Sequence, residues 1–518
     1  MRKLGKKFWI AMTLFGLIGQ VAWVVENMYL NVFIYKMFHA SAAQISMMVG
    51  ASAVAATLTT ILIGALTDRV GKRKIFMCGG YIIWGITILC FGLIRMDILT
   101  PICGGTLEAA ALGVQLVILL DCVMTFFGSA ANDAAYNAWI TDEGDESNRG
   151  KIEGINAMMP LVAILVVFGG FMGFDLEKAD SWSMIYAIIG GVVLVLGIAG
   201  IFLVEETKKD TIAAGTKTSY WENLVYSFRP STLNNNKLLY AVIGAFALFG
   251  ISIQIFMTYL ILYYEQTLHM ENYVIVMAPA IILAAIVTAF YGRLYDMLGF
   301  KQSVVPCIVM LIAGYVILYF STNTLPVFIG SLLMMCGYLT GMAVFGAMIR
   351  DHIPENMSGR FQGIPIIGQV LIPGVIGPAI GAFVLRNAEQ IENQDGTFSF
   401  IPNRNIWVAA TAAALVLSAA LYAIFMMVRL GHFELWTEAG ESVREGALVQ
   451  AKDQSSVTVA NQESAVTKRQ DPWDTYPMPQ MKRETYQILN DYWTLNGKPI
   501  RMPFPPQSML SEYGHRVG

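Results

Sequence analysis

The chain has too few charged residues for an ordinary soluble protein. Charged residues make up 14% of its 518 residues, whereas soluble globular proteins contain about 25%. The 34 Lys and Arg residues are nearly balanced by 37 Asp and Glu residues, which argues against a nucleic-acid-binding protein. A hydrophobic content of 56% argues against a disordered chain. The class that remains is an integral membrane protein.

Cysteine is also scarce. The six cysteines are scattered and show neither a CxxC pair nor another spacing typical of metal ligands. We therefore expect them to fill apolar positions, and we expect no metal or other cofactor.

Long apolar stretches are abundant instead. Each is long enough to cross a hydrocarbon core of about 30 Å, and each must be helical because lipid cannot satisfy bare backbone polar groups. The pattern predicts an all-α membrane protein with twelve transmembrane helices. These spans are residues 8–35, 41–66, 75–95, 112–140, 152–174, 182–204, 237–264, 272–292, 302–321, 325–349, 361–385 and 405–430.

The charges in the loops predict the orientation. With the N-terminus placed in the cytoplasm, the inner segments carry 19 Lys and Arg residues and the outer segments carry 5. Because basic residues favour the cytoplasmic side, we expect both termini in the cytoplasm of a protein that crosses the cell membrane many times.

Two cytoplasmic loops occur twice. GALTDRVGKRK at 64–74 matches GRLYDMLGFKQ at 292–302, and the loop from 140 to 155 matches the loop from 349 to 364, each at a constant offset. This repeat predicts two parallel six-helix bundles with the substrate between them near the middle of the membrane. The expected parts are an N-terminal bundle, a cytoplasmic linker and a C-terminal bundle at residues 1–204, 205–236 and 237–430.

The first of these loops resembles the signature of the major facilitator superfamily, G-x-x-x-D-R-x-G-R/K-R/K. Its glycines allow a tight turn, and an aspartate at a helix end can pair with a base or a helix N-terminus across the two halves. A purely topological role for the basic residues is the alternative. The residues we expect to gate transport are Asp68, Arg69, Gly71, Arg73, Arg149 and Asp296.

A narrower resemblance lies at 132–149, NDAAYNAWITDEGDESNR. It is similar to the end of the fourth helix in the glycoside–pentoside–hexuronide:cation symporters, although Ala134 and Ala135 replace the usual Ile-Pro. The resemblance implies sugar transport, with Asp133 as a substrate-binding acid. The paired aspartates of the sodium-coupled members are Ala56 and Thr60 here, so no carboxylate in that helix could hold Na⁺. Proton coupling or uniport is therefore favoured over sodium coupling.

Three acids lie well inside the predicted spans: Glu26, Asp121 and Asp133. No Lys or Arg lies near the middle of any span, and a charge inside the bilayer costs several kcal/mol unless it has a function. Desolvation favours the neutral form of a carboxyl group, which gives a chemical basis for proton exchange. Glu26 and Asp121 are the predicted proton-coupling residues.

Polar and aromatic residues share faces of the first and fourth spans at helical spacing. Carboxylates and amides can bind sugar hydroxyls, and aromatic rings can cover the apolar face of a sugar. Interhelical hydrogen bonds are the alternative for Asn27, and an interfacial belt is the alternative for Tyr136. The predicted substrate-binding residues are Gln20, Trp23, Asn27, Asn132, Asp133, Tyr136, Gln254 and Gln369.

The last 88 residues have a different character. We expect residues 431–470 to form a flexible linker. Residues 471–518 resemble the start of the sugar-binding domain of family 2 glycoside hydrolases, through residues such as Tyr476, Pro477, Asn490 and Trp493. The catalytic acids of that family lie in a later barrel, so we expect no enzyme activity. A cytoplasmic Pro-rich tail is the alternative.

Together these features predict a secondary transporter that imports a sugar or glycoside, with a proton, by alternating access. The alternative among carriers is an exporter of drugs or lipids. The alternative of another class is a membrane sensor or anchor without transport.

Overall fold

A computed structural model describes residues 4–144, 148–206, 229–270, 272–353, 363–393 and 396–430. They belong to a compact unit that extends from residue 1 to residue 436. The described part holds twelve helices that are long and apolar enough to cross a membrane, which confirms the predicted twelve-span, all-α fold. The predicted linker at 431–470 and the hydrolase-like segment at 471–518 lie outside the described residues.

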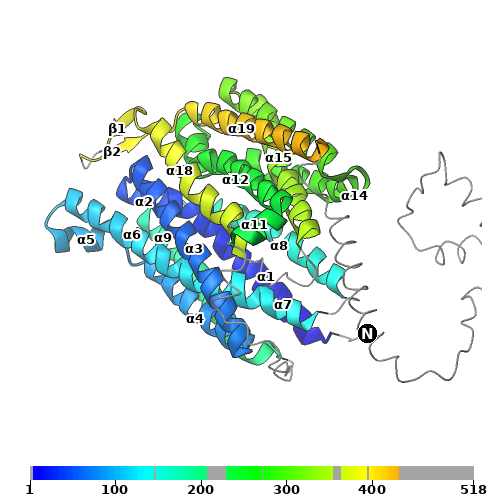
Figure 1. Cartoon of the computed structure of the whole chain (residues 1–518). Coiled ribbons are helices and arrows are strands. Elements are labelled where there is room, and N and C mark those ends of the chain that lie inside the picture. The colour runs from blue at the N-terminus through cyan, green and yellow to red at the C-terminus, as the bar shows by residue number, and fades with distance from the viewer. Residues whose placement is uncertain are drawn as a thin grey trace, which may run out of the picture. The chain divides into compact units, whose positions relative to one another are not determined.

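The first half begins with a span interrupted by a π-helical segment. It consists of α1 (Lys6–Val24), η1 (Val25–Tyr29) and α2 (Leu30–Phe38). The fourth span has the same design. The remaining elements are α3 (Ala42–Val70), α4 (Arg73–Phe91), α5 (Met96–Cys103), α6 (Thr106–Gly128), η2 (Ser129–Tyr136), α7 (Asn137–Glu143), α8 (Arg149–Phe171) and α9 (Ala179–Leu203), shown in Figure 1.

The second half contains two further π-helical segments, η3 and η4. Its elements are α11 (Pro230–Asn235), α12 (Lys237–Met257), α13 (Leu260–Leu262), η3 (Tyr263–Thr267), α14 (Tyr273–Phe320), α15 (Thr324–His352), α17 (Gly363–Ile366), η4 (Ile367–Leu371), α18 (Ile372–Leu385), β1 (Gln390–Glu392), β2 (Phe398–Phe400) and α19 (Asn405–Arg429). The long α14 holds two spans, Tyr273–Tyr295 and Met297–Phe320, which are separated by a break at Gly299.

Equivalent glycines end a helix in both copies of the repeated loop. Gly71 has a φ of 67° directly after α3, and Gly299 has a φ of 73° inside α14. Only glycine adopts a positive φ readily, but the two residues differ in ψ, which is 13° at Gly71 and 178° at Gly299. The positive φ at both positions agrees with the duplication that the sequence predicts, although the two turns are not identical.

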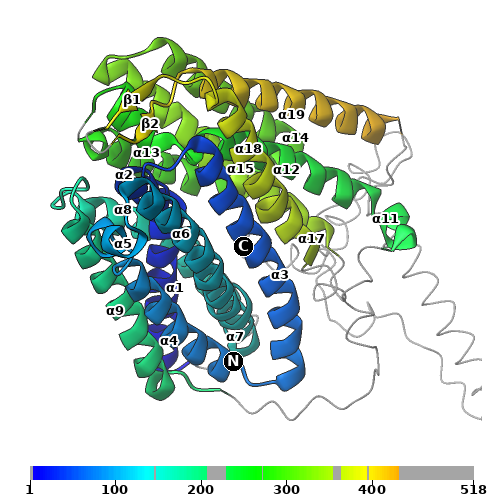
Figure 2. The same ribbon diagram turned by 90° about the vertical axis from the view of Figure 1, so that its left-hand side faces the viewer.

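A short β-hairpin between the eleventh and twelfth spans is not expected from the sequence. Strands β1 and β2 pair antiparallel, with Ile391 opposite Ser399. Figure 2 shows these strands at one end of the body together with α2 and α13. We call this end the hairpin end, and we call the opposite end, with the loop at 71–74, the basic end. The charge count predicts that the hairpin end faces the cell exterior.

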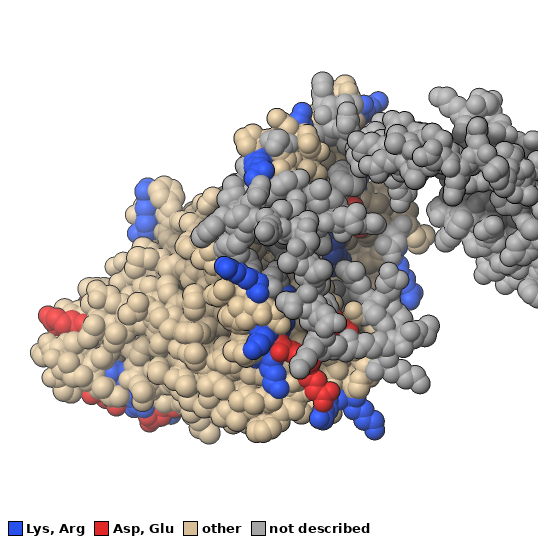
Figure 3. Space-filling view, turned by 60° about the horizontal axis from the view of Figure 1, so that its bottom comes forward, with Lys and Arg blue, Asp and Glu red and all other residues tan. Residues whose placement is uncertain are grey.

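Much of the surface between the two ends is apolar. Many large hydrophobic side chains are exposed, such as Phe202, Phe290 and Leu415. Figure 3 shows a broad area without charged side chains and groups of charged residues towards its margins. A surface of this kind fits the hydrocarbon core of a membrane.

Candidate substrate and proton site

Three of the described spans, the first, fourth and eleventh, contain a π-helical segment, and η3 follows the seventh span. The sequence predicts polar site residues in these four spans. Glu26 and Asn27 lie in η1, Asn132 and Asp133 lie in η2, and Gln369 lies in η4. Gln254 lies in α12, which a turn at 258–259 and the short α13 separate from η3. An inserted residue in a helix rotates the following side chains and weakens the backbone ladder, and such segments are frequent at functional sites. The helix interruptions therefore support these four spans as the place of the site.

Glu26 is a buried acid with hydrogen-bond donors from two other spans. Its side chain is buried, and its Oε1 atom accepts hydrogen bonds from the hydroxyls of Ser52 at 2.9 Å and Thr125 at 2.8 Å. The two hydroxyl oxygens lie 2.6 Å apart. The Oε2 atom is buried without a hydrogen-bond partner among the described residues. Three spans thus meet at one carboxyl group.

Asp121 and Asp133 bring two more carboxyl groups into the same region. Asp121 is buried, its Oδ1 atom has no partner in the described part of the chain, and its charge acts on Glu26. Asp133 also acts electrostatically on Glu26. Within the described residues, none of these three acids has an ion pair with a Lys or Arg. Uncompensated charge of this kind is costly, so the carboxyl groups must take up protons or meet a cation.

Two tryptophans form an aromatic wall in the first half. The rings of Trp23 and Trp84 lie 5.1 Å apart, and both indole N–H groups are buried without a partner among the described residues. The hydroxyl of Ser129 is buried in the same way. A Cβ on Gly128 would lie 2.8 Å from the Trp84 ring, so only glycine fits at this position of the fourth span, next to the two rings. Trp84 is fully buried behind the half-buried Trp23, and the two indole N–H groups are donors without a partner among the described residues, a type of group that suits a polyhydroxylated ligand.

Asn132 and Tyr136 hold the first, third and fourth spans together. The Asn132 amide donates to the Tyr81 hydroxyl at 2.6 Å, and Tyr81 donates to the carbonyl of Phe15 at 2.8 Å. The Tyr136 hydroxyl donates to the carbonyl of Met12 at 2.9 Å. Both side chains are buried in these contacts, and their role in binding substrate stays a prediction.

Four of the predicted amides are less enclosed than Glu26, Asp121 and Asn132. Asn27 is exposed and donates to the carbonyl of Trp23, while Gln369 is exposed and Gln20 and Gln254 are half-buried. The bonds of Asn27 and Asn31 stay within their own helix, at four-residue spacing, and do not join neighbouring helices. In η1 it is therefore Glu26 that points into the first half.

The predicted gating loop is held by Arg73. Its side chain forms an ion pair of 3.2 Å with Asp142 at the end of the fourth span and donates to the Thr67 hydroxyl at 2.7 Å. The Arg69 side chain is exposed. The side chains of Asp68, Arg149 and Asp296 lie outside what the structure describes, so their gating role stays a prediction.

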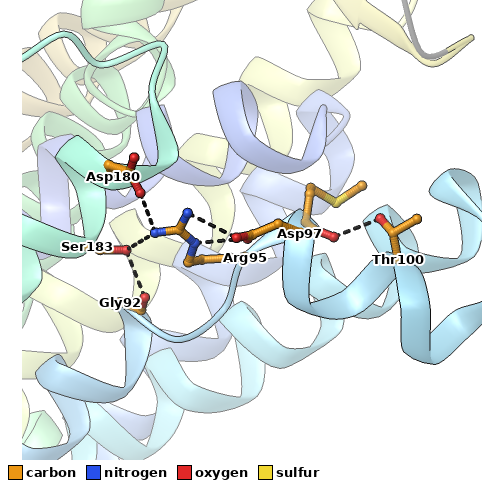
Figure 4. Close-up of polar contacts among 7 residues, drawn as sticks. Gly92, Arg95, Asp97, Thr100, Asp180 and Ser183 are labelled. Atoms are coloured by element: carbon orange, nitrogen blue, oxygen red, sulfur yellow. Dashed lines mark hydrogen bonds and ion pairs between the residues drawn. The ribbon is translucent and has the colours of Figure 1, made fainter.

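A separate cavity of about 180 Å³ lies at the hairpin end of the first half. It is lined by aromatic side chains that include Phe33 and Trp182, next to Arg95. Arg95 donates to Asp97 at 2.9 Å and to Asp180 at 2.7 Å, as Figure 4 shows, and this hydrogen bonding lowers the pKa of Asp97. No predicted site residue lines this cavity, and the Arg95 network ties the start of the sixth span to the end of the third.

Sequence patterns missed three residues of the site. Ser52, Trp84 and Tyr81 are in the second and third spans, where Ser52 stands among alanines and the two aromatic residues look like ordinary lipid-facing or core positions. Only the tertiary contacts with Glu26, Trp23 and Asn132 give them a role.

Comparison with known proteins identifies the family. The family model described as Major Facilitator Superfamily matches residues 8–378, which is most of the membrane body. The chain belongs to the major facilitator superfamily. It is therefore a membrane transporter and not an enzyme.

Individual relatives of this superfamily member differ in substrate. Multidrug resistance protein 2 of Bacillus subtilis (strain 168) is 22% identical over 362 residues, which cover 67% of this chain and 82% of the relative. Two solved structures share the fold: the nucleoside transporter NupG (TM-score 0.59, 14% identity) and a D-xylose-proton symporter (TM-score 0.60, 13% identity). Each match covers 80% of this chain, with 98% of NupG and 97% of the symporter.

Proposed function

We propose that this transporter takes up a sugar or glycoside together with a proton, by alternating access, across the cytoplasmic membrane. The observation that carries the proposal is Glu26. It is a buried carboxyl group with two hydroxyl donors on one oxygen and no basic partner among the described residues. Such a group can hold a proton that the membrane potential and the pH gradient drive inwards.

The surroundings of Glu26 favour a polyhydroxylated substrate. Trp23, which is half-buried, packs on the buried Trp84 in the same half, and the indole N–H groups of both have no partner among the described residues. Asp133, on η2, supplies a carboxylate from the fourth span that can accept from sugar hydroxyls. The names of the structural neighbours, a nucleoside transporter and a D-xylose-proton symporter, agree with a substrate of this class.

The resemblances in the sequence point the same way. Residues 132–149 resemble the glycoside–pentoside–hexuronide:cation symporters, and residues 471–518 resemble the start of a glycosidase sugar-binding domain. In this proposal Gln20 and Asn27 of the first half and Gln254 and Gln369 of the second half complete the site. Both termini lie in the cytoplasm.

The cycle follows from the charges. A proton reaches Glu26 while the hairpin end is open, and it neutralises a charge that is costly to enclose. The two bundles then rock about the bound sugar, so that the basic end opens and the hairpin end closes. Release of the sugar and of the proton from Glu26 into the cytoplasm resets the transporter.

Uptake into vesicles tests this function. Purified protein in vesicles should accumulate a labelled disaccharide when the outside is acidic, and should only equilibrate it without a pH gradient. Glu26→Gln should abolish accumulation and leave exchange of internal for external sugar intact. Absence of any sugar flux under both conditions would reject the proposal, and loss of exchange as well as accumulation would make Glu26 a binding residue.

A second candidate is export of a hydrophobic cation. The curated relative is a multidrug resistance protein, and three uncompensated acids beside two tryptophans would also attract a cation. Everted vesicles that concentrate a fluorescent lipophilic cation on acidification of their lumen, and that do not exchange sugar, would favour this candidate.

A further inference from the structure

We propose that Lys36 is a two-partner latch of the hairpin end: it binds Glu265 of the second half when this end is closed and retains Glu177 of its own half when it opens. The proposal rests on the alternating access of the proposed function. It assigns a role to three residues that lie outside the predicted site.

The latch is an ion pair between the two halves. The Lys36 Nζ atom, on α2, lies 2.7 Å from Glu265 Oε2 on η3 and 2.9 Å from Glu177 Oε1 in the connection between α8 and α9. The side chains of Lys36 and Glu265 are only 7% and 11% exposed, whereas Glu177 is 68% exposed. One buried lysine thus joins a buried acid across the halves and a solvent-exposed acid on its own half.

This division of exposure explains why two acids are needed. Separation of a buried ion pair leaves two unpaired charges with little water, which is strongly unfavourable. Glu177 belongs to the same half as Lys36 and is free to move with it, so Lys36 keeps a partner when the second half moves away. The exposed partner lowers the barrier to opening, while the buried partner stabilises the closed end.

Uncharged contacts surround the latch and close the same end. The Tyr273 hydroxyl donates to the Tyr29 hydroxyl at 2.9 Å, and the Tyr259 hydroxyl donates to the carbonyl of Ala42 at 2.9 Å. The Tyr35 hydroxyl donates to the carbonyl of Phe400 on the hairpin at 2.7 Å. Each of these bonds joins the first half to the second.

These hydrogen bonds can be exchanged for bonds to water when the halves separate, so each contributes modestly. The ion pair between Lys36 and Glu265 cannot be replaced by contacts with water at so small a cost in free energy, because both side chains are buried. Lys36 also lies in the same span as Glu26, beyond the π-helical segment η1. Movement of this span therefore displaces both Lys36 and Glu26.

Thiol labelling at Ala40 measures the latch without any substrate. Ala40 is 1% exposed at the hairpin end, so in a full-length chain with its six cysteines replaced, Ala40→Cys should react slowly with a membrane-impermeant maleimide. Glu265→Gln should raise the labelling rate at least fivefold. Glu177→Gln should lower it, because Lys36 then has no partner after opening.

The charge swap K36E/E265K is the matched control. Lys at position 265 would face Glu at position 36 and Glu177, so labelling should return to the parental rate or below. Unchanged labelling in Glu265→Gln, or labelling raised by Glu177→Gln as much as by Glu265→Gln, would overturn the latch. Labelling of the K36E/E265K variant that stays faster than in the parental protein, although the variant elutes as a monodisperse peak, would also overturn the latch.

The labelling result is independent of the sugar result. A latch that responds as described in a protein that moves no sugar would leave the latch standing and reject the proposed function. Normal proton-driven uptake with no effect of these variants on labelling would leave the proposed function standing and reject the latch.

Discussion

Glu26 and Glu265 are both buried carboxyl groups, but only one of them has a cation. Glu265 has Lys36 at 2.7 Å, while Glu26 has the hydroxyls of Ser52 and Thr125 and no basic partner among the described residues. The difference separates two uses of a buried acid in one membrane protein. A compensated acid can join two halves, and an uncompensated acid is suited to bind and release a proton.

Replacing each acid in turn with glutamine is the strongest test of this difference. Glu265→Gln removes the buried partner of Lys36 while Glu177 stays at 2.9 Å, so the protein should lose about 2 kcal/mol of stability, less than a wholly unpaired buried charge costs. Glu26→Gln removes an uncompensated charge and should leave stability unchanged or raise it. Thermal unfolding of the purified variants in detergent checks both. An equal loss in the two variants would contradict the distinction.

Ser52→Ala tests the same difference through a hydrogen-bond donor of Glu26. It removes one of two hydrogen bonds to Glu26 Oε1, and a bond to a charged group contributes about 1.5 kcal/mol. The balance between the charged and neutral forms of Glu26 should therefore change by at most roughly tenfold, since 1.4 kcal/mol corresponds to a factor of ten, and proton-driven uptake should fall. Thr57→Ala is a matched control in the same helix, because the Thr57 hydroxyl donates only to the carbonyl of Ala53. A similar loss in both variants would show a general effect on the helix.

Gly71→Ala and Gly299→Ala test whether the two halves use the repeated loop alike. Each change places a side chain at a positive φ. Gly71 has a left-handed helical backbone (ψ 13°), which should cost about 1 to 2 kcal/mol, and Gly299 (ψ 178°) lies in a region essentially restricted to glycine, which should cost about 1 to 3 kcal/mol. Gly244→Ala is the control, because its Cβ would meet no atom within 4 Å and its backbone is helical. Differential thermal unfolding should show similar losses for the two loop variants and none for the control. A loss in only one loop variant would contradict their equivalence.

The smallest effect is expected for Glu177→Gln. Glu177 is 68% exposed, and an exposed ion pair contributes less than about 1 kcal/mol. Thermal stability should therefore change little, in contrast to Glu265→Gln. A large loss would show that Glu177 is part of the buried pair and not a mobile partner.

Much of this fold could be predicted from the sequence because the bilayer imposes its own pattern. Apolar length alone gives the twelve spans, and the repeated Gly71 and Gly299 mark turns at equivalent positions of the two halves. The rarity of charge within the spans also identifies Glu26, Asp121 and Asp133 as candidates before any contact is known.

The rest depends on contacts between distant segments. The π-helical segment at 25–29 inserts into the first span, and there Glu26 is buried while Asn27 is exposed, which a uniform helical wheel does not predict. Ser52 and Trp84 carry no local signal, since their roles arise from Glu26 and Trp23. Lys36 and Glu265 are more than 200 residues apart in the printed sequence, and only the closed hairpin end brings them together.

Sugar-induced proton movement tests the central claim most directly. Vesicles without a pH gradient, in weak buffer, should take up protons when a transported disaccharide is added outside, and the external pH should rise. Glu26→Gln should still exchange sugar but give no pH change. The same pH rise in Glu26→Gln, or sugar influx without any pH change in the parental protein, would contradict the account.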